Sequence, residues 1–156
     1  KILGYLPESA PLYHDMLVYD YLNYVADIRG IDKGRKLDRI HQLADLCGIN
    51  EVMHKPVNEL SKGYKQRVGL AHAMINDPDI LILDEPFSGL DRAGCAMLEE
   101  SIDRRREVGK TVLLVTHDLD RGARLCDEAA LLDRGRLEFR GRAGAWSPDD
   151  LTEVDR

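Results

Sequence analysis

The stretch Ile80-Leu81-Ile82-Leu83-Asp84-Glu85-Pro86 decides the fold class of this 156-residue chain. Its four aliphatic residues predict a strand covered on both faces, as in a parallel sheet. Two carboxylates and a proline follow at once, so the strand should end in a polar turn. Because ligands of open α/β sheets gather at the carboxyl ends of the strands, Asp84 and Glu85 are candidate site residues.

The strands and helices around this stretch alternate. A helical pattern at about 92–108 leads to a second apolar strand, 111–115, and residues 2–6 predict a short strand upstream. This alternation favours an α/β fold in which helices wrap a parallel sheet. The turn Asp133-Arg134-Gly135 predicts a hairpin. Ser147-Pro148 has the composition of a new helix start.

A helical lobe is predicted between the first two strands. Apolar residues recur at helical spacing over 18–26 and 37–47, and a third helix is expected over 62–76. Gly30 and Gly48 are plausible ends of the first two helices. We therefore divide the chain into a strand over 1–8, a helical subdomain over 9–66, an α/β core over 67–141 and the start of a C-terminal extension over 142–156.

Bulk composition limits the possible partners. The formal net charge is −6 and the pI is near 5.4, which argues against nucleic-acid binding through a basic face. The three cysteines stand far apart in no metal-type or redox-type pair. No apolar run approaches the roughly 20 residues that span a bilayer. The chain starts at Lys1 inside an apparent strand, so we expect it to be part of a longer protein.

A turn at Leu60-Ser61-Lys62-Gly63-Tyr64 predicts a phosphate contact at the start of a helix. The Ser61 hydroxyl can bond a phosphate oxygen, and Gly63 lets backbone N–H groups approach closely. The positive end of the helix dipole points to the same place. The alternative interpretation, an ordinary helix N-cap at Ser61, is the more common use of such a sequence.

Three side chains at strand ends suggest hydrolysis of a nucleotide. Asp84 can hold Mg²⁺, and Glu85 can polarise a water for attack on a γ-phosphate. His117 follows strand 111–115 after one residue and is expected beside Glu85, where it can contact the γ-phosphate. The alternative is two solvated acids at a strand end. Gly109-Lys110-Thr111 is not a phosphate-binding loop, because a helix precedes it and a strand follows.

Taken together, the motifs resemble those of the ATP-binding cassette (ABC) family, the ATPase subunits of membrane transporters. Residues 60–64 resemble the LSGGQ signature, with Lys62 and Tyr64 as departures, and Lys65-Gln66-Arg67-Val68 keeps the pattern that follows. Residues 80–85 resemble the Walker B strand with its catalytic glutamate. Ser88-Gly89-Leu90-Asp91 matches the D-loop, Thr116-His117-Asp118 the switch histidine, and Glu8 stands at the Q-loop glutamine.

The resemblance implies a P-loop NTPase-type core, present here in part, with an inserted helical subdomain. It implies ATP and Mg²⁺ as ligands, catalysis by Glu85 and His117, and nucleotide contacts from Ser61, Gly63, Glu8 and Asp91. Asp84 and Glu8 would face the metal.

The resemblance also implies partners and a location. A second ABC ATPase would pair head to tail with this one, and a transmembrane permease would contact the helical lobe, with Leu12, Tyr13 and Met16 as candidates. The protein would lie in the cytoplasm at the inner face of the cell membrane. Glu8 and Lys62 favour an exporter. The Walker A loop is expected upstream of Lys1, so the segment alone should hydrolyse little ATP.

Two other interpretations remain open. The first is a P-loop-free remnant that only docks on a partner, although such a remnant has no need of Glu85 or His117. The second is a non-transport cassette, which usually carries a second cassette or long coiled-coil arms. No heptad run is visible in the sequence.

Overall fold

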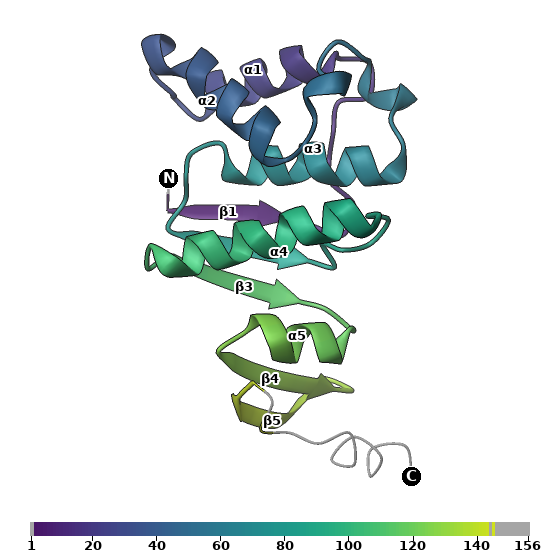
Figure 1. Ribbon diagram of the computed structural model, residues 1–156, viewed down its shortest axis with the longest axis vertical. Helices are drawn as coiled ribbons and strands as arrows, with labels where there is room; N and C mark the ends of the chain where they lie inside the picture. The colour runs from purple at the N-terminus through teal and green to yellow at the C-terminus, as the bar shows by residue number, and fades with distance from the viewer. Residues whose placement is uncertain (1, 144, 146–156) are drawn as a thin grey trace. The chain divides into compact units, whose positions relative to one another are not determined.

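The computed structural model describes residues 2–143 and 145. The chain forms two compact units, Lys1–Val115 and Thr116–Arg156, which are described separately. In the first unit, strands β1 (Leu3–Leu6), β2 (Ile80–Asp84) and β3 (Thr111–Val115) form a sheet in the order β1-β2-β3. All neighbours are parallel, which confirms the predicted α/β class with a parallel sheet (Figure 1).

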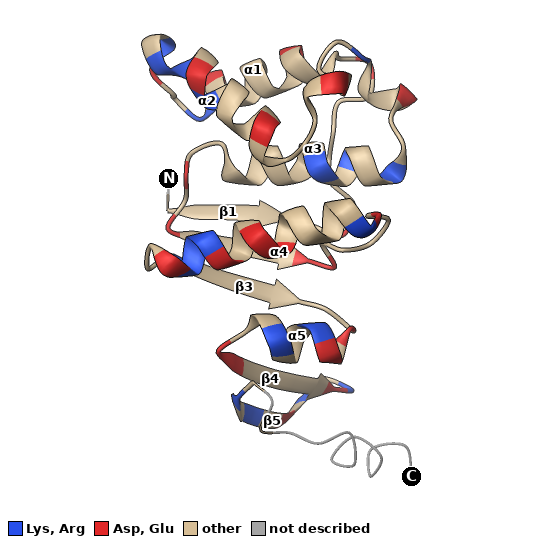
Figure 2. Cartoon of the chain, viewed as in Figure 1, with Lys and Arg blue, Asp and Glu red and all other residues tan. Residues whose placement is uncertain are grey.

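One face of this sheet is covered by helices α3 (Lys62–Met74) and α4 (Arg92–Glu107). Leu6, Leu81 and Leu83 point to this face and are at most 1% exposed. The strands carry no charge except at Asp84, and Figure 2 draws them almost wholly in tan. Burying such side chains against helices is the main stabilising contribution of the sheet.

The opposite face of the sheet is open among the described residues. Leu3 and Tyr5 are each 51% exposed, Leu113 is 53% exposed and Val115 is 48% exposed. The expectation that β2 is covered on both faces is therefore wrong for the described residues. The apolar run indicates that both faces of β2 favour burial, but it does not indicate which residues cover each face.

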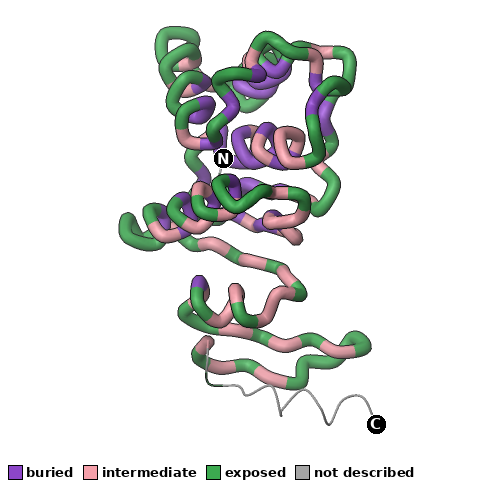
Figure 3. The backbone as a smooth tube through the Cα atoms, turned by 45° about the vertical axis from the view of Figure 1, so that its right-hand side comes forward, coloured by how far each residue is buried: buried purple, intermediate pink, exposed green. Residues whose placement is uncertain are grey.

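The helical lobe contains α1 (Val18–Ile28), α2 (Lys33–Leu46) and two 3₁₀ turns, η1 (Asn50–Val52) and η2 (Val57–Glu59). Tyr21 and Leu22 of α1 and Ile40 and Leu43 of α2 are almost fully buried, at helical spacing. Figure 3 shows this alternation of buried and exposed turns. The helices end as predicted, because Gly30 and Gly48 have φ of +70° and +61°.

Three cations hold the C-terminal end of α3 to its neighbours. Arg39 of α2 donates to the carbonyl of Ile75 at 3.0 Å, Arg105 of α4 to that of Pro78, and Lys110 to that of Asp77 at 3.1 Å. The Ile75 carbonyl lies at the negative end of the helix dipole, where a cation is favourable, and the carbonyls of Asp77 and Pro78 belong to the loop that follows. These contacts tie the C-terminal end of α3 and the loop after it to α2 and α4.

The second unit holds α5 (Leu119–Leu125) and a hairpin of β4 (Glu128–Asp133) and β5 (Arg136–Arg142). Arg134 and Gly135 have φ of +44° and +79°, as a two-residue hairpin turn requires. The predicted hairpin is confirmed. The predicted helix start at Ser147-Pro148 lies outside the described residues. The predicted subdomain division at residue 66 stays a prediction.

Candidate functional site

Asp84 and Glu85 lie at the carboxyl end of β2, the central strand, and both are half-buried. Glu85 has φ of +45°, a left-handed conformation that non-glycine residues seldom adopt. Its backbone N–H donates to the carbonyl of Val115 at 2.9 Å, which fixes the turn against β3. Such strain costs on the order of 1–3 kcal/mol and concentrates at functional sites.

Glu8 follows the neighbouring strand at the same edge of the sheet. Leu6 of β1 is in register with Leu83 of β2, so both strands end side by side. Glu8 is exposed. Among residues 2–143 and 145, no group of three or more metal-type side chains occurs. One or two carboxylates completed by substrate phosphates are the usual set for Mg²⁺, and Asp84 with Glu8 fits that chemistry.

The turn over residues 60–64, called the signature turn below, starts α3. Ser61 is the N-cap, and its Oγ accepts a hydrogen bond from the backbone N–H of Tyr64 at 3.3 Å. The N-cap interpretation is therefore correct for the local structure. It leaves the phosphate role open, because a hydroxyl that accepts one bond still has a proton to donate. Both Ser61 and the first turn of α3 are accessible to a ligand.

The signature turn contacts the loop over residues 88–91. A Cβ on Gly63 would lie 2.7 Å from the carbonyl oxygen of Gly89, so only glycine fits this contact. Asp91 caps α4 by accepting from the backbone N–H of Gly94 at 2.7 Å, and it pairs with Arg67 at 2.9 Å. The hydrogen bond from Gly94, followed by Arg67, lowers the pKa of Asp91 below its ordinary value.

The residues that join these loops were not predicted from the sequence. Arg67 reaches Asp91 across 24 positions, and its guanidinium also lies 5.5 Å from the centre of the Tyr64 ring. The Tyr64 hydroxyl in turn donates to Glu51 of η1. One sequence signal could have indicated this contact. Arg67 keeps the family pattern and Tyr64 departs from it, and an arginine three residues after an aromatic residue in a helix favours a cation–π pair.

His117 follows β3 by two residues and belongs to the second unit. The predicted contact of His117 with Glu85 therefore stays a prediction. Asp118 caps α5 by accepting from the backbone N–H of Arg121 at 3.0 Å. The structure thus gives the Thr116-His117-Asp118 motif a clear local role, which is to start α5.

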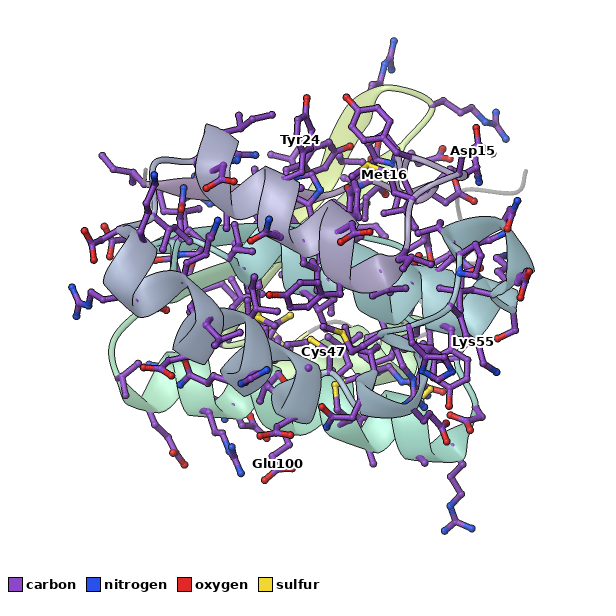
Figure 4. All side chains as sticks on the ribbon, turned by 90° about the horizontal axis from the view of Figure 1, so that it is seen from above. Asp15, Met16, Tyr24, Cys47, Lys55 and Glu100 are labelled. Carbon is purple, nitrogen blue, oxygen red and sulfur yellow. The ribbon has the colours of Figure 1, made fainter. Side chains whose placement is uncertain are left out.

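The three residues proposed for a partner contact differ in exposure. Leu12 is 6% exposed and packs in the core, whereas Tyr13 is 54% exposed and Met16 is half-buried. Tyr13 lies edge-on to Tyr24, with ring centres 5.6 Å apart. Figure 4 shows Met16 and Tyr24 along one edge of the lobe, so the surface is an aromatic patch on α1 and the loop before it.

Comparison with known proteins identifies the class. The family model described as ABC transporter matches residues 1–88, more than half of the chain. The chain therefore belongs to the ABC transporter family, and within it to the ATP-binding subunits. A solved structure titled "Structure of ATP binding subunit of ABC transporter" superposes with a TM-score of 0.87 at 27% identity, over 98% of this chain and 68% of that one.

The curated relatives carry the same description. An uncharacterized ABC transporter ATP-binding protein of Methanocaldococcus jannaschii is 38% identical over 140 residues, covering 90% of this chain and 53% of the relative. A methionine import ATP-binding protein of Yersinia pestis is 34% identical over 155 residues, covering 99% of this chain and 47% of the relative. The chain spans about half the length of these relatives. Across the described part of the chain, no helix has the length and hydropathy to cross a bilayer.

Proposed function

We propose that the whole protein is an ATPase that powers a membrane transporter. The observation that carries the proposal is the strained backbone of Glu85, directly after Asp84 at the end of the central strand. A glutamate in the left-handed conformation destabilises the fold. A residue that served only as a solvated turn would be expected to avoid this strain. The family assignment supplies the chemistry for which this geometry is suited, which is in-line attack of water on a γ-phosphate.

The proposed roles are those that the resemblance to the ABC family implies for these residues. Glu85 accepts a proton from the attacking water, and His117 holds the γ-phosphate and that water. Ser61 and the backbone of Gly63 donate hydrogen bonds to the γ-phosphate of an ATP molecule bound by a second ABC ATPase. Asp91 lies beside that contact. Mg²⁺, held by Asp84 and Glu8 with the phosphates, would neutralise part of the phosphate charge.

We further infer that the site is completed by a Walker-type phosphate-binding loop outside these 156 residues. The open face of the sheet supports this inference, because parallel sheets are normally covered on both sides. Leu3, Tyr5 and Leu113 supply an apolar surface against which a further α/β segment can pack. The segment alone should then hydrolyse little ATP, and turnover near that of the full-length protein would contradict this inference.

The proposed partner is a transmembrane permease that contacts the aromatic patch of Tyr13 and Tyr24. Their rings are exposed yet held against each other, as at protein interfaces. The protein would then lie at the inner face of the cell membrane. We propose export, from Glu8 in place of the family glutamine and from Lys62. Since one relative is named as a methionine import protein, transport assays in both directions test this point.

The deciding experiment is Glu85→Gln in the full-length protein. We expect ATP binding to persist and turnover to fall at least a hundredfold, because the amide cannot accept the proton. Glu100→Gln is the matched control, since Glu100 is an exposed carboxylate on α4 that pairs with Arg104 and has no proposed role in hydrolysis. Unchanged turnover in Glu85→Gln, or an equal loss in Glu100→Gln, would contradict the assignment.

A mixed-dimer experiment tests the second subunit. Ser61→Ala in one protomer should impair the ATP site whose phosphate-binding loop belongs to the other protomer. Pairing this protomer with a protomer that carries Glu85→Gln allows the activities of the two ATP sites to be measured separately. Loss confined to the ATP site of the altered protomer itself would contradict the head-to-tail arrangement.

A further inference from the structure

Lys62 is one of the two residues, with Tyr64, at which the chain departs from the family signature. It occupies an unfavourable position. It is the first residue of α3, directly after the N-cap Ser61. The positive end of a helix dipole disfavours a cation there. The departure would cost stability unless the lysine makes compensating contacts, and such local conflicts are typical of functional positions.

The contacts of Lys62 lie on the loop that follows β2. Its Nζ donates to Ser88 Oγ at 2.8 Å. Its aliphatic stem runs across Gly89, where an added Cβ would lie 2.9 Å from both Cγ and Cδ of the lysine. Gly89 has φ of +78°, so the loop needs glycine for its backbone as well as for this contact. The three residues form what we call the lysine strap.

The lysine strap reinforces a contact that already exists between two backbones. Gly63, the next residue, lies against the carbonyl oxygen of Gly89, and Arg67 pairs with Asp91 one turn further along α3. The signature turn and the 88–91 loop are therefore joined at three successive points. The contact made by Lys62 lies directly beside Ser61, the residue proposed to contact the γ-phosphate.

We propose that Lys62 is a positioning residue that couples the signature turn to the 88–91 loop, so that the two loops engage nucleotide as one rigid surface. This inference rests on the proposed ATPase function. Lys62 acts through Ser88 and Gly89, and not by contact with ATP. Its ammonium group provides a hydrogen bond to a neutral hydroxyl, and its stem excludes water from the glycine contact.

A double-mutant cycle in the full-length protein tests the inference. Lys62→Met keeps the stem and removes the donor, and Ser88→Ala removes the acceptor. We expect each to lower kcat roughly tenfold with little change in KM, and the double variant to be no worse than either alone, because all three lose the same bond. Lys62→Arg should recover activity to within about threefold of the original, since it can still donate to Ser88.

Lys33→Met is the matched control. Lys33 is exposed and is also the first residue of a helix, α2, after a side-chain N-cap, Asp32. Its replacement should leave kcat and KM unchanged. A rise in KM for Lys62→Met with no effect of Ser88→Ala would show a direct phosphate contact and would overturn the inference. Additive losses in the double variant would overturn it as well.

Hydrogen exchange separates this inference from the proposed function. The amides of residues 61–64 and 88–91 should exchange faster in both Lys62→Met and Ser88→Ala, whether or not the protein hydrolyses ATP. Faster exchange with no effect on kcat would show a strap without a catalytic role and would overturn the inference. Glu85→Gln tests the ATPase function by itself and should leave exchange in both segments unchanged.

Discussion

The Tyr21 hydroxyl and His72 Nδ1 share a partly buried hydrogen bond that joins α1 to α3. Tyr21 is 1% exposed, and burial raises its pKa to about 12. The two rings are 5.7 Å apart. A buried polar pair of this kind stabilises the fold only as long as both partners are present.

Tyr21→Phe should therefore destabilise the protein by about 1–2 kcal/mol, because it leaves a partly buried histidine nitrogen without this partner. The measurement is the free energy of unfolding in urea. Tyr19→Phe is the control, since Tyr19 lies on the same helix and is 37% exposed, and its effect should stay within about 0.5 kcal/mol. Equal effects of the two substitutions would show that the buried bond contributes nothing.

The protonation of His72 should make stability depend on pH. Burial first, and the neighbouring Arg29 second, lower the pKa of His72 below 6.5. The unfolded chain therefore binds this proton more readily than the folded one. The contribution of neutral His72 to the free energy of unfolding is complete above about pH 6.5, and it is lost as the pH falls through the pKa of His72 in the folded protein.

Denaturant midpoints between pH 7.5 and 5 measure this dependence. His72→Gln, which cannot gain a charge, should reduce the slope of stability against pH in that range. His41→Gln, at an exposed position on α2, should leave the slope as it is. An unaltered slope in His72→Gln would refute the prediction.

Cys47 should resist alkylation in the native protein. Its side chain is fully buried, and this burial raises the pKa of the thiol to about 12, so almost no thiolate is present at pH 8. Figure 4 places Cys47 among the helices, whereas Glu100 lies at the periphery. Cys95 and Cys126 are half-buried and serve as internal references. Mass spectrometry after a pulse of iodoacetamide should find Cys47 modified only when denaturant is present.

Relieving the strain at Glu85 should stabilise the protein while it removes activity. Asn tolerates a left-handed backbone better than Glu, so Glu85→Asn should raise the unfolding midpoint by an amount equivalent to about 0.5–1 kcal/mol. Arg134→Asn is the matched control, because Arg134 has φ of +44° in the hairpin turn and no proposed role in ATP hydrolysis. It should raise the midpoint similarly and leave turnover intact. A lowered midpoint for Glu85→Asn would show that its side chain stabilises the fold.

Local sequence signals were sufficient for the strands of the parallel sheet and for helices α1 to α4, but not for the two 3₁₀ turns. The strand predicted over 111–115 coincides with β3, and the helix predicted over 92–108 ends one residue beyond α4. These elements carry their information in short-range periodicity, in glycine stops and in the Asp133-Arg134-Gly135 turn.

Contacts between distant loops were not accessible in the same way. Lys62 and Ser88 are 26 positions apart, and no periodicity links them. The open face of the sheet was missed for a related reason, since a run such as Ile80–Leu83 reports a preference for burial and not the identity of the covering residues. The candidate site was predicted mainly from strand ends and family resemblance, both of which specify position and not side-chain contact.

The uncovered side of the β1–β3 sheet has a practical consequence. Apolar strands that the described residues leave uncovered offer copies of the same molecule a complementary surface. These 156 residues on their own should therefore aggregate as the protein concentration rises, at temperatures below that of thermal unfolding. Aggregation should begin at the sheet while the helical lobe is still folded.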